Sequence, residues 1–351
     1  MLTMQFQLSK YINRLVKAGF IPVFTGFILL LSSCGKDELI SNTAYNLEIP
    51  KGFPAMAIPV DNQLTVQRVA LGKKLFFDNI LSRDSSVSCS SCHLPEYGFS
   101  DPEQFSKGVA ERIGFRQSIT LTNVAYNTLF FWDGGATSLE LQLLAPIENP
   151  DEMDMNMPKL IERLSNHPDY PALFKKAYDR EIDPFTITRA LAAYERTLIS
   201  GNSRYDMYVN AGKEDALTES EKRGLEVFNS SRTNCSQCHS GFNFTSFGFE
   251  NNGLYEYFAD SGRARVTTLR SDVGLFKIPT LRNIGVTAPY MHDGSLTTLE
   301  QVIEHYQAGG KLHENKSPLI TGFQLTTQEK TDLLNFLNSL TDYEFISQTA
   351  E

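Results

Sequence analysis

The feature of this sequence that most constrains its fold is a pair of C-x-x-C-H motifs, Cys89-Ser90-Ser91-Cys92-His93 and Cys235-Ser236-Gln237-Cys238-His239. In this pattern two thiols form thioethers with haem vinyl groups, and the adjacent histidine binds the iron. A redox dithiol needs no such histidine. A shared zinc ion does not fit either, because the pairs are about 140 residues apart where zinc ribbons use roughly 15–20. We therefore predict two c-type haems and a redox function.

The fifth cysteine, Cys34, ends a segment that has the features of an export signal. Residues 1–33 contain three basic residues and no acid, and an apolar stretch, 20–31, leads into Leu31-Ser32-Ser33-Cys34. This order is typical of a signal peptide, and its end resembles a bacterial lipobox, which would make Cys34 the lipidated first residue. An uncleaved membrane anchor is the alternative, but the apolar stretch falls short of the roughly 20 residues that span a bilayer. We expect an exported bacterial lipoprotein, at the periplasmic face of a membrane or at the cell surface.

The charge of the chain limits its partners. The 351 residues include 32 basic and 41 acidic ones, a net charge of −9, and loss of the signal would leave 29 basic residues and a charge of −12. An acidic surface disfavours nucleic acid and anionic membranes and attracts basic proteins such as a cationic cytochrome c. We expect membrane contact through the lipid only and no nucleic acid, and a homodimer stays an open alternative.

The mature chain is long enough for two domains. We expect a polar tether at 34–51, an N-terminal domain at 52–203 and a C-terminal domain at 204–346. A weak internal repeat supports duplication, because Leu71-Gly72-Lys73-Lys74-Leu75-Phe76 precedes the first haem motif and Arg223-Gly224-Leu225-Glu226-Val227-Phe228 the second.

Helical signals dominate the secondary structure, and alternating strand patterns are scarce. The fold class we predict is all-α, with two cytochrome c-like domains that each carry one covalently bound haem. The expected helices begin at the capping boxes Thr218-x-x-Glu221 and Thr326-x-x-Glu329, or follow the apolar periodicity of 157–178, which Pro168 and Pro171 interrupt, and of 185–198.

With the haem motifs placed, the chain resembles the bacterial di-haem cytochrome c peroxidase family, which includes the MauG-type enzymes. The resemblance extends over nearly the whole mature length and implies a peroxidatic N-terminal domain and an electron-transfer C-terminal domain. The motifs that carry it are Leu71–Asp78, Ser88–His93, Phe130–Gly134, Glu148–Met153, Ile278–Asn283 and Ala288–Gly294.

A peroxidase of this family needs an open iron position at the N-terminal haem. In many members a loop, here 100–116, delivers a second histidine to that haem. This chain has no histidine between His93 and His167, so the resemblance implies a site that is open without prior reduction. Lys107 is the alternative ligand that would block it, and His167 is more distant and resembles a surface helix break. The six histidines are His93, His167, His239, His292, His305 and His313.

The resemblance also assigns three catalytic residues. Glu152 matches the family's catalytic glutamate, Gln142 the glutamine that positions peroxide, and Trp132 the tryptophan that carries electrons between the haems. From the residues alone, Glu152 is one of four acids in 148–154 and would be solvated. In an apolar haem pocket the same carboxyl would have a raised pKa and could act as both base and acid.

The second haem should keep two protein ligands, and His239 is one of them. Peroxidases proper use a methionine fourteen residues beyond the histidine of the Pro-Tyr-x-His motif, and counting from His292 leads to Tyr306. MauG-type relatives have tyrosine here, and an anionic phenolate favours high-valent iron whereas methionine raises the potential. Met291 and His305 are the rival ligands.

Relatives hold a calcium ion between the haems through one side-chain amide and two backbone carbonyls. The matching residues are Gln117, Thr287 and Pro289, with glutamine where the family has asparagine. Oxygen ligands of this kind suit calcium. We expect a calcium ion at this position.

The expected function is reduction of hydrogen peroxide to water, with electrons that an external donor such as cytochrome c supplies through the His239 haem and Trp132. The first alternative is a MauG-type oxidase that modifies a partner protein, which Tyr306 favours. The second is a simple electron-transfer cytochrome, which has no need of Gln142 or Glu152.

Overall fold

The computed structural model describes residues 42–347, and helices are its main elements. The expected signal at 1–33 and the lipidated Cys34 lie outside the described residues. The α-helices are α2 (Val66–Phe77), α3 (Leu139–Gln142), α4 (Leu144–Glu148), α5 (Met157–Ser165), α6 (Tyr170–Tyr178), α7 (Pro184–Glu195), α8 (Arg204–Val209), α9 (Glu219–Asn229), α10 (Cys235–Cys238), α11 (Ala264–Thr267), α12 (Leu299–Gln307), α13 (Thr327–Asn338) and α14 (Tyr343–Ile346). Short 3₁₀ helices occur at Val60–Asn62, Asn79–Leu81, Cys89–Ser91, Pro95–Tyr97, Val109–Glu111, Val124–Tyr126, Arg270–Asp272 and Ile284–Val286.

Helix boundaries follow the signals in the sequence. Side-chain capping boxes at Thr218 and Thr326 open α9 and α13, as predicted. The apolar stretch 157–178 is divided into α5 and α6 on either side of Pro168, because a proline in a helix interior removes a hydrogen bond and clashes with the preceding turn.

A crossed helix pair organises the N-terminal half, residues 42–203. Helix α2 packs on α7, and their closest approach is at Gly72, where a Cβ would lie 1.9 Å from the Ala190 carbonyl oxygen. Only glycine permits this contact. Leu75 and Phe76 of α2 are fully buried in the core beside it.

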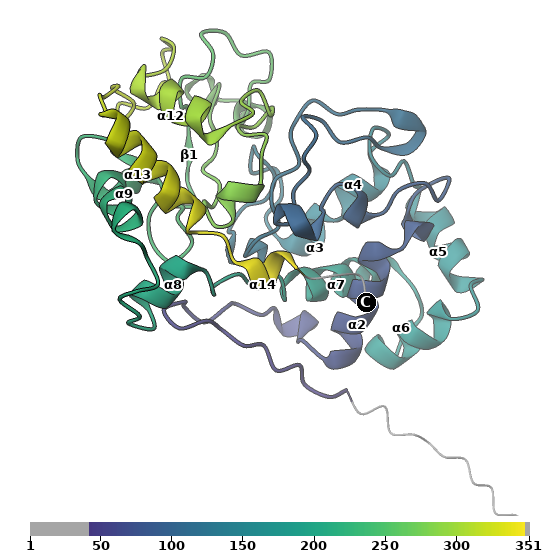
Figure 1. Ribbon diagram of the computed structural model, residues 1–351. Coiled ribbons are helices and arrows are strands. Elements are labelled where there is room, and N and C mark those ends of the chain that lie inside the picture. Colours follow the sequence, from purple (N-terminus) through teal and green to yellow (C-terminus); the bar gives the residue numbers. More distant parts are fainter. Residues whose placement is uncertain (1–41, 348–351) are drawn as a thin grey trace, which may run out of the picture. The chain divides into compact units, whose positions relative to one another are not determined.

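The C-terminal half, 204–347, repeats this arrangement. Helices α9 and α13 lie side by side (Figure 1), and a Cβ on Gly224 would lie 2.0 Å from the Asp332 carbonyl oxygen. Gly224 has the place in its motif that Gly72 has in the first. The internal repeat of the sequence therefore corresponds to a repeated helix pair.

The two halves are joined by buried amide hydrogen bonds and by the end of the chain. Asn123 Nδ2 donates to Asn243 Oδ1 at 3.0 Å, and Asn283 Nδ2 donates to Thr122 Oγ1 at 3.1 Å. Phe345 of α14, in the range expected for the C-terminal domain, packs against Phe99 in the N-terminal core with ring centroids 5.4 Å apart. Both halves belong to one compact unit that begins at residue 42.

Extended structure is minor, in agreement with a mostly helical fold. Strand β1 (Phe249–Glu250) pairs antiparallel with β2 (Phe276–Lys277). The described part of the expected tether, 42–51, lies along the N-terminal half, where the Tyr45 N–H donates to the Leu64 carbonyl at 3.1 Å. Within residues 42–347 no helix is long and apolar enough to cross a membrane.

Candidate haem and peroxidatic sites

Both cysteine motifs form a single helical turn. The N–H of His93 donates to the carbonyl of Cys89 at 3.0 Å, and that of His239 to the carbonyl of Cys235 at 2.9 Å. Burial raises the pKa of all four thiols, that of Cys92 to about 11. The thiols are free and lie in apolar surroundings suited to thioether formation with a hydrophobic macrocycle.

The two histidines are oriented in the same way. Nδ1 of His93 donates to the Phe99 carbonyl at 3.0 Å, and Nδ1 of His239 donates to the Phe244 carbonyl at 3.2 Å. A backbone acceptor on Nδ1 fixes the ring and leaves Nε2 to bind a metal. Burial lowers the pKa of both rings, that of His239 to about 4, so the neutral, ligating form prevails at neutral pH.

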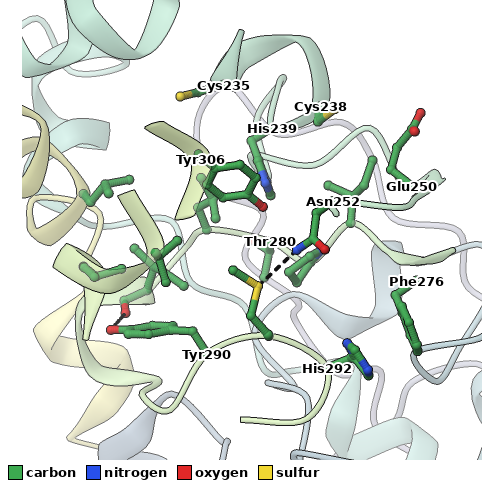
Figure 2. Close-up of a pocket in the computed structure, with 18 of the residues that line it drawn as sticks. Cys235, Cys238, His239, Glu250, Asn252, Phe276, Thr280, Tyr290, His292 and Tyr306 are labelled. Carbon is green, nitrogen blue, oxygen red and sulfur yellow. Dashed lines mark hydrogen bonds between the residues drawn. The ribbon is translucent and has the colours of Figure 1, made fainter. Parts of the chain in front are cut away.

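A cavity in the C-terminal half carries the donor groups of the second cysteine motif. Cys235, Cys238 and His239 line it together with Tyr306 (Figure 2). Its other walls are largely apolar and include Phe228, Ile278, Leu281, Ile303, Leu333 and Leu337. Two thiols and an imidazole on an apolar cavity are the donor set that a covalently attached haem requires.

Two of the three candidates for the second ligand reach this cavity. Tyr306 of α12 and Met291 both line it. His305 does not belong to its described lining, and its Nε2 instead donates to the Asn252 carbonyl at 3.0 Å. Burial raises the pKa of the Tyr306 hydroxyl to about 12, although a hydrogen bond with Asn252 opposes that shift.

Trp132 belongs to the N-terminal half but lines the C-terminal cavity. Its Nε1 donates to the Gln117 carbonyl at 2.8 Å, and the Gln117 N–H donates to the His292 carbonyl at 2.9 Å. The Lys277 N–H donates to the Trp132 carbonyl at 2.8 Å. With 8 % of its surface exposed, the indole is fixed at the junction of the halves.

Glu152 lies close enough to the first cysteine motif for its charge to act on both thiols. It follows α4, and its Oε1 accepts from Asn149 Nδ2 at 2.7 Å. Desolvation of the carboxyl raises its pKa, although the hydrogen bond from Asn149 lowers it. The charge of Glu152 in turn raises the pKa of Cys89 and Cys92. The residue as a whole is exposed to solvent, as the four clustered acids predict. A carboxyl with a raised pKa and access to water can serve as a proton-exchanging group.

Gln142, Lys107 and His167 are the other candidate residues of the first site. Gln142 is the half-buried last residue of α3. Lys107 has a 63 % exposed side chain and pairs with Glu111 at 3.0 Å. His167 is at the break between α5 and α6, where its Nδ1 accepts from the Asp169 N–H at 3.2 Å. The structure therefore places Lys107 and His167 in local surface contacts.

The expected calcium ligands Gln117, Thr287 and Pro289 all line the C-terminal cavity. Gln117 Nε2 donates to Ser100 Oγ at 2.8 Å and to the Asp101 carbonyl at 3.2 Å. In the part of the chain that the structure describes, no group of three or more histidine, cysteine or acidic side chains could hold a metal ion. A cation here would depend on amide and carbonyl oxygens.

A second, longer repeat was missed in the sequence. Residues 120–149 align without gaps on 280–309, with Thr-Leu-x-Asn at the start and Asp-Gly ten residues later in both. Each segment contains a left-handed asparagine, Asn123 or Asn283. A capping Ser138 or Thr298 then begins α3 or α12. In this alignment Pro146 corresponds to Tyr306.

Glu195 is another residue that no local pattern revealed. It is 3 % exposed, at the end of α7, and its Oε2 has no hydrogen-bond partner among residues 42–347. Burial raises its pKa to about 8, while Arg196 lowers it and Glu140 raises it. When ionised, Glu195 also raises the pKa of the Cys89 thiol, so the group lies near the first motif. With a pKa of about 8, its carboxyl is mostly protonated at neutral pH.

Known proteins match both the sequence and the fold. The profile of the family described as di-haem cytochrome c peroxidase matches residues 66–215. The methylamine utilization protein MauG of Methylophilus methylotrophus is 36% identical over 330 residues, which cover 91% of this chain and 96% of that protein. The cytochrome c551 peroxidase of Pseudomonas aeruginosa is 34% identical over 288 residues, 79% of each chain.

A solved structure of a similar protein has the same fold. The crystal structure of a MauG-like protein associated with microbial copper homeostasis superposes with a TM-score of 0.83 at 34% identity, over 88% of this chain and 98% of that one. The chain belongs to the di-haem cytochrome c peroxidase family. It is an oxidoreductase, and the family implies haem c as its cofactor.

Proposed function

We propose that this protein reduces hydrogen peroxide to water at its His93 site, with electrons that enter through its His239 site. The observation that carries the proposal is that the carboxyl group and the tryptophan lie near different cysteine motifs. The charge of Glu152 raises the pKa of Cys89 and Cys92 in the first motif, whereas Trp132 lines the cavity of His239.

The chain offers the residues to hold two haems. Cys89, Cys92 and His93 would hold the first. Cys235, Cys238 and His239 would hold the second, with Tyr306 as the further ligand. When bound, haem c supplies an iron that binds peroxide at the first site and relays electrons at the second.

Neither Pro146 nor Lys107 offers the first site a second ligand. Pro146 stands where the second half has Tyr306, and a proline side chain has no donor atom. Lys107 is engaged with Glu111 at the surface. Both observations support a site that peroxide can reach in the oxidised protein.

Glu152 is the proton-handling group. Cleavage of the O–O bond needs a proton moved from the near to the far oxygen, after which two electrons and two protons complete the formation of two waters. A carboxyl whose pKa is raised by its surroundings takes the first proton as a base and returns it as an acid. Gln142, ten residues earlier, would orient the peroxide.

Trp132 is the electron path between the halves. Its hydrogen bonds to Gln117 and from Lys277 fix both the ring and the backbone. A calcium ion held by the Gln117 side chain and the Thr287 and Pro289 carbonyls would strengthen the same junction.

A MauG-type reaction is the second candidate, because Tyr306 rather than a methionine stands at the ligand position. Such an enzyme would use the oxidising equivalents on a partner protein.

The expected signal at 1–33 and the lipobox-like sequence ending at Cys34 support export and anchoring by lipid. The acidic surface supports a basic cytochrome c as the electron donor.

Steady-state turnover separates the two candidates. With reduced cytochrome c as donor, the purified protein should consume peroxide and oxidise two cytochromes for each molecule consumed. Cytochrome oxidation that never exceeds a blank, together with peroxide-dependent oxidation of co-purified protein without a reductant, would contradict the peroxidase and favour the second candidate.

A further inference from the structure

Asn252 contacts both side chains that compete for the second iron. Its Nδ2 donates to Met291 Sδ at 3.1 Å, and its side chain lies near the Tyr306 hydroxyl (Figure 2) and lowers the pKa of that group. In Figure 2 the hydroxyl of Tyr306 points toward Asn252, and a dashed line joins the amide to the sulfur. One amide therefore acts on two rival ligands.

The position of Asn252 is fixed from several sides. Its Oδ1 accepts from the Leu254 N–H at 3.1 Å, which closes a local turn. Its carbonyl accepts from Nε2 of His305, the neighbour of Tyr306 on α12. Gly253 adds a contact with the segment that follows α12, because its carbonyl accepts from the Lys311 N–H at 2.6 Å. The amide is held at a set place relative to the helix that presents Tyr306.

The two interactions of the amide act in the same direction. A donor to the tyrosine oxygen stabilises the anionic phenolate, because hydrogen bonds to charged groups are stronger than those between neutral groups. A donor to the thioether engages a sulfur that is only a weak acceptor and holds it on the amide. Both contacts favour phenolate over thioether at the metal.

Met291 is a realistic competitor. It lines the same cavity as Tyr306, and its long side chain is flexible. Methionine is also a known axial ligand of c-type haem. Its backbone has φ +76°, in a turn that Gly294 closes by donating to the Met291 carbonyl at 3.3 Å. The turn keeps the Met291 sulfur beside the cavity, where the amide of Asn252 donates a hydrogen bond to it.

We propose that Asn252 is a positioning residue that selects Tyr306 over Met291 as the second protein ligand of the iron at the His239 site. This inference rests on the proposed assignment of Tyr306 to the second iron. It makes the identity of the ligand depend on a residue more than fifty positions away from it in the sequence.

The test compares Asn252→Asp and Asn252→Leu with the parent protein. Asn252→Asp keeps the acceptor for the Leu254 N–H and removes the donor, and Asn252→Leu removes both. Mass spectrometry and the haem content first establish that both haems are attached. Absorption, resonance Raman and potentiometry of the ferric protein then report the ligand.

We expect both variants to lose the tyrosinate vibrations, to gain the red absorption band of sulfur-ligated ferric haem and to show a higher potential for that haem. Adding Met291→Leu to either variant should remove the sulfur band and return the tyrosinate vibrations. This rescue is not expected of a merely structural residue.

Three results would contradict the inference in different ways. Parent-like tyrosinate spectra in both variants would overturn the role of Asn252 and leave the assignment of Tyr306 intact. A sulfur band in the parent protein would overturn both. Loss of tyrosinate without a sulfur band, unchanged by Met291→Leu, would overturn the competition with Met291.

Discussion

Pro146 and Tyr306 occupy equivalent positions in the two halves of this protein, each eight residues after the residue that caps its helical segment. The repeated turns before them support the match. The Phe130 N–H donates to the Ala136 carbonyl at 2.9 Å, and the Tyr290 N–H donates to the Leu296 carbonyl at 2.7 Å. A residue without a donor atom in one half and a phenol in the other would account for the different chemistry that we propose for the two haem sites.

A ligand placed at Pro146 should therefore close the first site. Pro146→His is expected to turn its ferric spin signal from high to low spin and to abolish the reaction of the oxidised protein with peroxide. Electron paramagnetic resonance and stopped-flow absorption measure these effects. Ala145→His, at the exposed neighbouring position of α4, is the matched control and should change neither. Equal effects of both variants would show that Pro146 does not face the iron.

Glu152→Gln should leave both haem spectra nearly intact and slow peroxide turnover by about 10²-fold or more, the usual contribution of a positioned proton shuttle. Because the pKa of Glu152 is raised, parent turnover should fall with decreasing pH through a limb above the ordinary carboxyl range, and the variant should lack that limb. Steady-state kinetics across pH measure both effects. Glu148→Gln removes an exposed acid of the same segment and should keep parent rates. Retention of parent turnover by Glu152→Gln would exclude the residue from the mechanism.

Tyr306→Met should raise the potential of the second haem and produce the sulfur-ligand band, because a neutral thioether replaces an anionic oxygen. The variant should also behave more like a conventional peroxidase. Spectroelectrochemistry provides the measurement. Tyr290→Phe, which removes another phenol of the same cavity, is the control and should leave the potential unchanged. An unaltered spectrum in Tyr306→Met would identify Met291 or His305 as the ligand.

Glu195 predicts a pH dependence of stability. Its pKa is raised to about 8 from 4.5, so between these values the folded protein holds a proton that the unfolded chain has released. The free energy of unfolding should fall as the pH rises through this window, by up to about 1.4 kcal/mol for each unit. Glu195→Gln should flatten the decline and stabilise the protein most near its alkaline end. Urea unfolding of the haem-bound protein across the window tests this, with the exposed Glu181→Gln as control. The same slope in all three proteins would refute a neutral Glu195.

Local patterns in the sequence were sufficient for the elements and for the haem attachment motifs. Thr218 and Thr326 cap the helices they were expected to cap, because a capping box depends on residues three apart. The glycines of the short repeat, Gly72 and Gly224, mark helix crossings in both halves. The ligand spacing that the family resemblance implies, counted from His292, led to Tyr306, which lines the second cavity.

Local sequence patterns could not predict the contacts between segments that are distant in the chain. Phe345 reaches the N-terminal core from the end of the chain, although its own sequence resembles the end of a C-terminal domain. Asn252 lies in a loop without periodicity, and Glu195 at the end of an apolar helix resembles a surface acid. Their roles arise from burial and from partners that only the folded chain supplies.

The reaction of the fully oxidised protein with peroxide tests the central claim most directly. The diferric protein, with no reductant present, would be characterised by electron paramagnetic resonance and then mixed with one equivalent of hydrogen peroxide in a stopped-flow instrument. The account predicts one high-spin and one low-spin signal, prompt loss of the high-spin signal on mixing and consumption of the peroxide. Two low-spin signals and unreacted peroxide until one haem has been reduced would contradict it.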